Sequence, residues 1–407
     1  MLVIGYDARG ERETAVNGEH VLLIGPPGSG KTQGFLVPSI VTHPGPVLAT
    51  SSKGDIALTT VARRRRVGRT LSFSPGAETV PGTTPVFWDP VRGCDNYDEA
   101  LLRADAMVRT VQALNGSGAD DAFWYAMASR LLAALLHAAA IERLGGGGGD
   151  GVLAVSRWVS SGDLDDPIAI LAAAHAGSAQ LIVAGIDAQE GRLRDSVLMT
   201  TAQALRVFDS PSVQCAMDSY EAFDAQTFVA GRDTLYVVAP LEQQEMLASL
   251  VVGLIDDVTR AAMAMSAGEE HLERQARRSV VFALDEVANI APLPNLPRIA
   301  SAGGGQGCHV MAVLQDLSQA KQRWKDAADG FVTMFHHKIL LPGVMHQPTL
   351  EAFERVLPHS GGGLGAGSVA EWSASRIAGM PLGRALRVSG ARPVETAVHF
   401  PLLPKRN

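Results

Sequence analysis

Short apolar runs of strand length recur at wide intervals along the chain, separated by polar or helix-forming sequence. None alternates cleanly between apolar and polar positions, which predicts strands buried on both faces of a sheet. Strands of this kind, alternating with helices, are typical of a parallel sheet built from crossover units. The runs lie at residues 21–24, 47–50, 234–239, 280–284, 310–314 and 338–341.

A long stretch of helix-forming sequence interrupts this rhythm between Pro90 and Thr234. Residues 123–141 form its most regular part and predict one helix, which the glycine run 145–149 terminates. Further helical segments are predicted at residues 152–160, 167–176, 193–208 and 212–217.

We therefore expect an α/β fold in which an all-α insertion divides a discontinuous sheet domain. The insertion is predicted at residues 92–224. The two parts of the sheet domain are then residues 1–91 and 225–407.

The first apolar run leads directly into a glycine-rich loop that fits G-x-x-x-x-G-K-[ST]. Glycines in such a loop let backbone N–H groups face a β-phosphate, and the helix that follows adds its positive N-terminal end. Lys31 is expected between the β- and γ-phosphates, with the Thr32 hydroxyl on Mg²⁺. ATP and Mg²⁺ are thus the predicted cofactors. The predicted nucleotide-binding residues are Gly25, Pro26, Pro27, Gly28, Ser29, Gly30, Lys31, Thr32 and Gln33.

Two later strands end in polar residues suited to this chemistry. The run 280–284 ends in Asp285, predicted to hold Mg²⁺ with Thr32, and Glu286, predicted to orient and deprotonate the attacking water. This pair favours a hydrolase over a kinase. Gln315 ends the run 310–314 and is predicted to sense the γ-phosphate, completing a catalytic set with Lys31 and Glu286; a plain strand-end cap is the alternative.

Other polar groups are weaker candidates for contact with phosphates or with the nucleotide site. Lys53 and Asp55 follow a strand at the same sheet edge and either approach the site or form an ordinary turn. The basic run 63–66, with Arg69, either contacts phosphates or is a solvated helix end, and we favour the latter.

Composition limits the partners and the compartment. The 407 residues carry a net charge of -7, so any contact with a polynucleotide must be local or arise on assembly. Three widely spaced cysteines suit a reducing cytoplasm and, with the isolated pair His336-His337, do not predict a metal site. No signal peptide is recognised. The apolar stretch 131–141 is shorter than the roughly 20 residues that a membrane-spanning helix needs. The glycine-rich segment 361–367 is expected to be a mobile surface linker.

The order of these pieces resembles the type IV coupling proteins, the TraG/TraD-like ATPases of bacterial conjugation and type IV secretion. The resemblance runs from about His20 towards the C-terminus. It is carried by the phosphate loop through Pro38, by Ser52-Lys-Gly-Asp55, by Phe123-Trp124 with Leu131-Leu132, by Asp285-Glu286, and by Gln315-Asp-Leu-Ser-Gln319.

The resemblance implies a RecA-like P-loop NTPase that forms homo-hexamers around a channel, with a monomer in solution left open. It implies a cytoplasmic motor that is peripheral or tethered to the membrane. The motor would pump DNA, expected to be single-stranded, or a relaxase–DNA complex to a type IV secretion channel at the inner membrane. Recognition of cargo would then fall to residues 92–224.

Three departures from the family pattern stand out. Relatives usually begin with transmembrane helices, whereas 24 residues precede Gly25, so the anchor either lies outside this sequence or belongs to a partner. Ser51 and Asp55 replace the aspartate and glutamate of "D-P-K-G-E". The segment 303–307 lacks the usual arginine, which across a subunit boundary is worth about 10³ or more in rate, and Arg298 is the nearest substitute.

Two other readings remain open. The chain could be a hexameric DNA translocase of the FtsK/HerA kind, although the large helical insertion argues against it. It could instead be a non-hydrolysing adaptor that recruits cargo and switches with bound ATP. The missing arginine favours the adaptor, and the intact Asp285-Glu286 pair opposes it.

Overall fold

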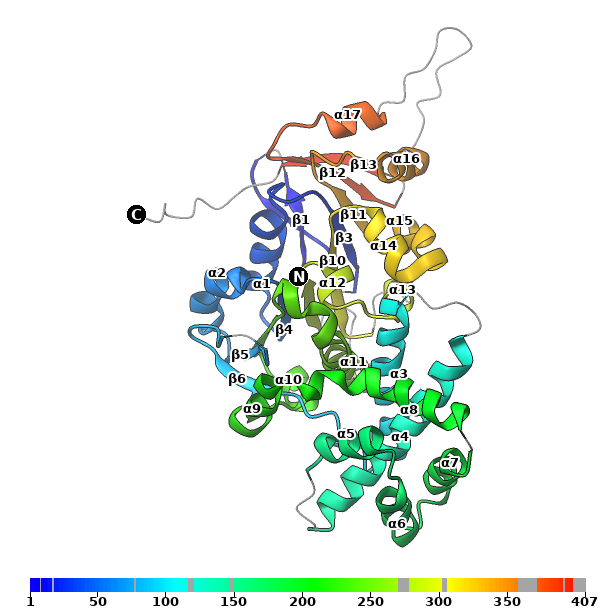
Figure 1. Ribbon diagram of the computed structural model, residues 1–407. Coiled ribbons are helices and arrows are strands. Elements are labelled where there is room, and N and C mark those ends of the chain that lie inside the picture. The colour runs from blue at the N-terminus through cyan, green and yellow to red at the C-terminus, as the bar shows by residue number, and fades with distance from the viewer. Residues whose placement is uncertain are drawn as a thin grey trace.

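The computed structural model describes most of the chain, and it forms one mixed sheet covered on both faces by helices (Figure 1). The glycine-rich segment 361–367 lies outside the described residues. Those residues are 1–7, 9–16, 18–76, 78–115, 121–146, 150–189, 191–269, 278–301, 306–357, 372–390 and 392–397.

All six predicted strands are present and adjacent in the parallel part of the sheet, in the order β11-β3-β10-β9-β4-β8. Every residue in them is buried, as their unbroken apolar sequence predicts. The prediction of a buried parallel sheet is confirmed for β3 (Val21–Ile24), β4 (Val47–Ser51), β8 (Thr234–Val238), β9 (Val280–Leu284), β10 (Cys308–Leu314) and β11 (His337–Leu340).

The sheet extends further at both ends than the apolar runs indicate. Beyond β8 the parallel strands β5, β6 and β7 follow, while beyond β11 the strands β12, β13, β1 and β2 are antiparallel. The parallel arrangement indicated by the apolar runs therefore does not extend to this second edge. The added strands are β1 (Val3–Tyr6), β2 (Arg12–Thr14), β5 (Thr70–Phe73), β6 (Thr84–Phe87), β7 (Glu221–Ala222), β12 (Arg384–Ser389) and β13 (Arg392–Ala397).

Each face of the sheet has its own apolar cluster. On one face, α1 (Val37–Thr42) and α2 (Asp55–Arg64) pack against alternate strand residues such as Leu23 and Val281. On the other face, the neighbouring residues Leu22 and Phe282 join a cluster that continues through α11 (Gln244–Gly268) into the helices inserted after β6. The sheet and these helices therefore share one core.

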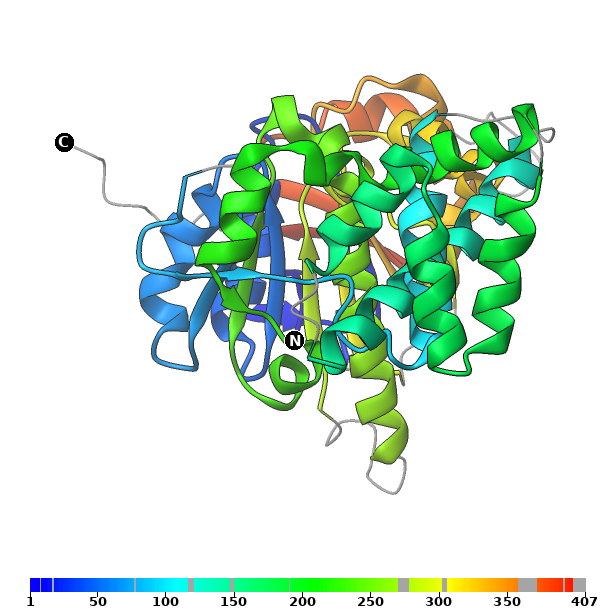
Figure 2. The same cartoon turned by 60° about the horizontal axis from the view of Figure 1, so that its bottom comes forward.

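The inserted helices lie at the end of the molecule away from the antiparallel edge (Figures 1 and 2). In the described residues no strand intervenes between β6 and β7, and the predicted helical segments each fall on a helix. The boundaries 92 and 224 themselves stay predictions. The helices are α3 (Tyr97–Asn115), α4 (Ala122–Leu144), α5 (Val152–Ser161), α6 (Asp165–Ala173), α7 (Gly177–Asp187), α8 (Arg192–Leu205), the short η3 (Arg206–Asp209) and α9 (Pro211–Ser219).

Helix α4 is longer than the apolar stretch 131–141 that the sequence indicates. Among the described helices it alone, at 23 residues, is long and apolar enough to cross a membrane. The expectation that this apolar helix is shorter than a membrane span is therefore wrong. However, 67% of its most apolar window is buried, because α4 packs against α3, α7 and α8. Its composition is accounted for by its place in the protein core.

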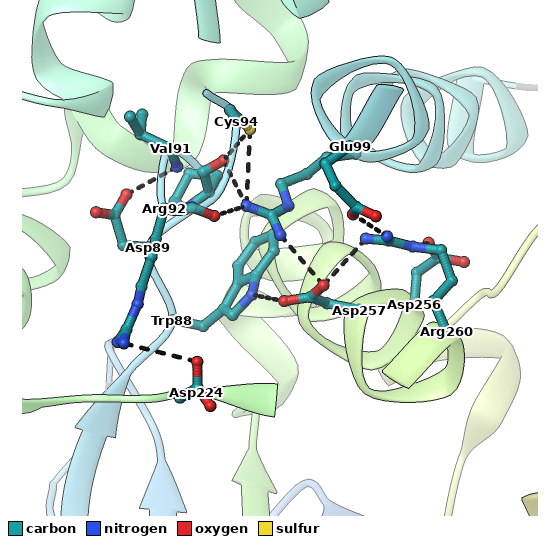
Figure 3. A network of polar contacts seen from close by, with 12 residues as sticks. Trp88, Asp89, Val91, Arg92, Cys94, Glu99, Asp224, Asp256, Asp257 and Arg260 are labelled. Atoms are coloured by element: carbon teal, nitrogen blue, oxygen red, sulfur yellow. Dashed lines mark hydrogen bonds and ion pairs between the residues drawn. The ribbon is translucent and has the colours of Figure 1, made fainter. Parts of the chain in front are cut away.

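A buried polar network joins the inserted helices to the sheet (Figure 3). Asp257 on α11 accepts hydrogen bonds from Trp88 Nε1 at 2.9 Å, from Arg103 Nη2 at 3.1 Å and from Arg260 Nη2 at 3.0 Å. The Arg103 guanidinium also lies 5.2 Å from the centre of the Trp88 ring. Since buried charges require partners, this network holds α3 on α11 beside the end of β6.

The basic run 63–66 is only partly a solvated helix end. Three of its arginines are exposed, and Arg69 Nη2 donates to both carboxylate oxygens of Glu221. Arg64 is fully buried, which the sequence did not indicate. It donates hydrogen bonds to Thr234 Oγ1 and to the carbonyls of Ile40, His43, Gly45 and Arg232.

His337, for which the sequence did not predict a metal site, is buried in β11. Its ring lies between Glu19 Oε2 and Ser389 Oγ, each at 2.8 Å. This carboxylate partner is distant in sequence, so the pattern alone did not indicate it.

Candidate active site

Four neighbouring parallel strands, β3, β10, β9 and β4, bring every predicted active-site segment to one edge of the sheet. Parallel strands all end at the same edge, and that edge is where open α/β sheets bind ligands. The phosphate loop follows β3, Gln315 follows β10, Asp285 and Glu286 follow β9, and the turn 51–55 follows β4.

The phosphate loop needs its glycines for two different reasons. Gly28 and Gly30 have φ angles of +76° and +97°, which L-residues with a side chain rarely adopt. A Cβ on Gly25 would lie 2.6 Å from Ser29 Oγ and 2.9 Å from Leu341 Cβ. Directly after the loop, the chain makes one turn of π-helix, η1 (Thr32–Leu36), which leads into α1.

The polar side chains of the loop are arranged to receive a phosphate group. Lys31 Nζ donates hydrogen bonds to the carbonyls of Gly25 at 2.5 Å and Pro26 at 2.8 Å, and burial lowers the pKa of Lys31. In the described part of the chain, neither Ser29 Oγ nor Gln33 Oε1 has a hydrogen-bond partner, although both atoms are buried. Buried polar atoms without partners are costly, so the loop fits a polar ligand that satisfies them.

The Asp285 carboxylate lies beside the loop. Thr32 Oγ1 donates to Asp285 Oδ2 at 3.4 Å, and Thr50 Oγ1 donates to the Asp285 carbonyl at 2.7 Å. The pKa of Asp285 is raised to about 6, chiefly by burial; the charge of Lys31 opposes this shift, and the charges of Glu286 and Asp55 add to it. A hydroxyl and a carboxylate side by side fit a divalent cation, since hard cations prefer oxygen ligands. Thr50 was missed, although it ends a predicted strand at this edge.

Glu286 has an unusual backbone conformation. Its φ of +48° and ψ of +44° lie in the left-handed region, which costs a non-glycine residue about 1–3 kcal/mol. The helix α12 (Val287–Ile290) begins directly after it, and the amides of Asn289 and Ile290 donate to the Glu286 carbonyl. Such strain in a non-glycine residue is often found at functional sites.

Gln315 is placed next to the phosphate loop. The Leu314 carbonyl accepts a hydrogen bond from the Gly25 amide at 3.1 Å, so the residue after β10 directly neighbours the loop. The backbone N–H of Gln315 donates to Gln319 Oε1 at 2.8 Å, at the start of α14 (Leu317–Trp324).

Asp55 rather than Lys53 approaches the site. Ser51 Oγ donates to Asp55 Oδ1 at 2.8 Å, and Asp55 is near enough to Asp285 to raise the pKa of that carboxyl group. Lys53 is exposed. The alternative of an ordinary turn therefore describes Lys53 better than Asp55.

We expect Asp285→Asn to stabilise the nucleotide-free protein at pH 8. The raised pKa of Asp285 means that the folded state holds its proton more tightly than the unfolded state, so stability falls as pH rises from about 4 to about 6. A neutral amide removes this penalty, which is up to about 3 kcal/mol for a shift of about two units. Thermal unfolding without Mg²⁺ or nucleotide measures it.

The gain in melting temperature should disappear near pH 4, where Asp285 is protonated in both states. Asp326→Asn, which changes an exposed carboxylate, serves as the control and should show no such pH dependence. An unchanged or lower melting temperature for Asp285→Asn at pH 8 would contradict the electrostatic account of the site.

Comparison with known proteins identifies the family of this chain. Residues 4–339 match the family described as type IV secretory system conjugative DNA transfer. The chain belongs to this family. Its role therefore lies in conjugative DNA transfer through a type IV secretion system, with DNA and the secretion apparatus as partners. No curated protein sequence matches the chain.

Solved structures of coupling proteins share the fold of this conjugative DNA transfer protein. The unbound monoclinic form of the bacterial conjugative coupling protein TrwBdeltaN70 is 15% identical, with a TM-score of 0.69 over 99% of this chain and 90% of that chain. Plasmid coupling protein TrwB in complex with the ATP analogue ADPNP gives a TM-score of 0.68 over 100% and 95% of the two chains, also at 15% identity. TrwB in complex with ADP and Mg²⁺ gives a TM-score of 0.67 over 98% of this chain and 92% of that chain, again at 15% identity. The fold is therefore that of a RecA-like P-loop NTPase, as predicted.

The arginine expected from relatives is not supplied by a described residue of the loop before β10. Residues 302–305 lie outside the described residues. Arg298, the predicted substitute, is exposed on α13 (Leu296–Ser301). A role for it across a subunit boundary stays a prediction.

Proposed function

We propose that this chain is an ATPase that couples ATP hydrolysis to moving DNA, or a relaxase–DNA complex, to a type IV secretion channel. The observation that carries the proposal is the contact of Thr32 Oγ1 with Asp285 Oδ2 at 3.4 Å, with Glu286 next in the chain and Gln315 beside the loop. A P-loop enzyme needs these groups together. TrwB has been solved with an ATP analogue and with ADP and Mg²⁺, which supports the same cofactors here.

Each residue has a distinct part in this proposal. The loop amides and Lys31 bind the phosphates, while Thr32 and Asp285 hold the metal ion. Bound Mg²⁺ would neutralise phosphate charge. Glu286 orients the attacking water and accepts its proton, and Gln315 senses whether a γ-phosphate is present.

The charge distribution supports a division of labour within the chain. Residues 92–224 contain 18 acidic residues, nine arginines and no lysine, so the inserted helices are more acidic than the whole chain, whose net charge is -7. Contact with DNA phosphates requires positive charge, and an acidic surface opposes it. We therefore assign recognition of protein cargo, such as a relaxase, to the inserted helices, and DNA contact to the rest of a cytoplasmic homo-hexamer held at the membrane.

Steady-state ATP hydrolysis, measured with and without single- and double-stranded DNA, tests the proposal. We expect turnover that rises when DNA is added, and the preferred strand form identifies the polynucleotide that is moved. Tight ATP binding without turnover on either DNA would overturn the motor. It would favour an ATP-switched adaptor instead, a function consistent with the arginine-free sequence of residues 303–307.

A further inference from the structure

The segment that carries Glu286 has little means of holding its own shape. Glu286 is in the left-handed conformation, and α12 after it has only four residues. A helix of one turn is not stable by itself, and its last carbonyl groups have no partner within the helix. The position of the Glu286 carboxylate must therefore depend on groups outside the segment.

Two adjacent side chains at the end of α14 hold this segment by its backbone. Arg323 Nε donates to the carbonyl of Ala288 at 2.8 Å, and Trp324 Nε1 donates to the carbonyl of Leu293 at 2.8 Å. Trp324 is buried, and its ring lies 5.0 Å from that of Phe331. The two donors thus hold the chain on both sides of the end of α12, at Ile290.

The other end of α14 begins beside the phosphate loop. Asp316 caps the helix by accepting from the Ser318 amide at 2.8 Å, and the Leu317 amide donates to Thr349 Oγ1 at 3.0 Å. Helix α14 has eight residues and so spans about 12 Å, with Gln315 before it and Arg323 and Trp324 at its end. A short helix fixed at both ends moves as one body.

We infer that Arg323 and Trp324 are positioning residues that keep the position of Glu286 fixed relative to that of Gln315. They act through the backbone of residues 288–293 and contact the carbonyls of Ala288 and Leu293. Movement of Gln315 on loss of the γ-phosphate is passed along α14 to the segment that carries Glu286. The inference rests on the proposed ATPase function and adds a mechanical link between its sensor and its base.

Substitution of the two donors tests the link. In the full chain, Arg323→Ala is expected to lower kcat about 10- to 100-fold, because small misplacement of a catalytic group has effects of this size. The dissociation constant for ATP, measured separately, should stay within about twofold of wild type, since the phosphate loop is untouched. Arg323→Lys should restore part of kcat, because lysine can still donate one hydrogen bond.

Trp324→Phe keeps an aromatic ring next to Phe331 but removes the N–H donor, so it should lower kcat without large loss of stability. Lys321→Ala is the matched control on the same helix, because Lys321 is exposed and pairs only with the surface carboxylates of Asp326 and Asp329 among the described contacts. It should leave kcat unchanged.

Turnover per ATP-binding site separates positioning from a merely structural role. A structural role would lower the melting temperature and the number of binding sites, with kcat per site unchanged, and that result would overturn the inference. Full activity of Arg323→Ala, measured beside an active wild-type protein, would also overturn the inference. An inactive wild-type protein would overturn the proposed function itself, and the link with it.

Discussion

Glu286→Gln is expected to lower kcat for ATP hydrolysis by about 10²–10⁴-fold, the usual contribution of a general base. The amide has almost the same shape but cannot accept the proton of the attacking water. ATP affinity should be preserved, because the phosphates are bound by the loop 25–33 and not by this side chain. Turnover under saturating ATP and the dissociation constant for ATP measure the two effects separately.

The matched control is Glu351→Gln, which changes a partly exposed carboxylate on α16 (Gln347–Val356), outside the site. It should leave both quantities unchanged. Turnover of Glu286→Gln within about twofold of wild type would show that another group takes the proton. Conjugative transfer that survived the loss of hydrolysis would contradict the motor and support the ATP-switched adaptor.

Arg64→Ala is expected to lower the free energy of unfolding by at least about 3 kcal/mol, since even one hydrogen bond to a charged group is worth about 1.5–3 kcal/mol. Arg64 is fully buried and donates to four backbone carbonyls and to Thr234 Oγ1. Alanine leaves these acceptors without a donor and opens a cavity at the end of α2. The midpoint of urea unfolding, followed by circular dichroism, measures the loss.

Arg63→Ala provides the comparison, because Arg63 precedes Arg64 on the same helix and is exposed. Its effect should stay within about 0.5 kcal/mol, as for most surface substitutions. If the two variants unfolded at the same urea concentration, the hydrogen bonds of Arg64 would not contribute to stability as described.

Much of the parallel sheet could be predicted because burial on both faces leaves an unbroken apolar run in the sequence. Such runs identified β3, β4, β8, β9, β10 and β11. The parallel arrangement then determined that the residues after these strands lie at one edge. This is why Thr32, Asp285 and Gln315 could be assigned to one site although they are far apart in the chain.

The strands at the two ends of the sheet could not be predicted in this way. β1 and β2 are four and three residues long, and Tyr6 of β1 pairs with Ala397 near the other end of the chain. Polar residues or glycine interrupt the strands at this edge, so they form no unbroken apolar run, and their partners are selected only when the rest of the sheet is in place. The antiparallel edge is therefore a product of tertiary structure.

The same distinction separates residue type from residue environment. The sequence by itself determined the phosphate loop, the Asp285-Glu286 pair and the family, because each depends on the identity and spacing of neighbouring residues. Only the tertiary structure decided that Arg64 is buried while Arg63 is exposed, and that Arg323 and Trp324 hold the segment after Glu286. Burial and hydrogen bonding of this kind depend on groups that are distant in sequence, and folding alone brings them together.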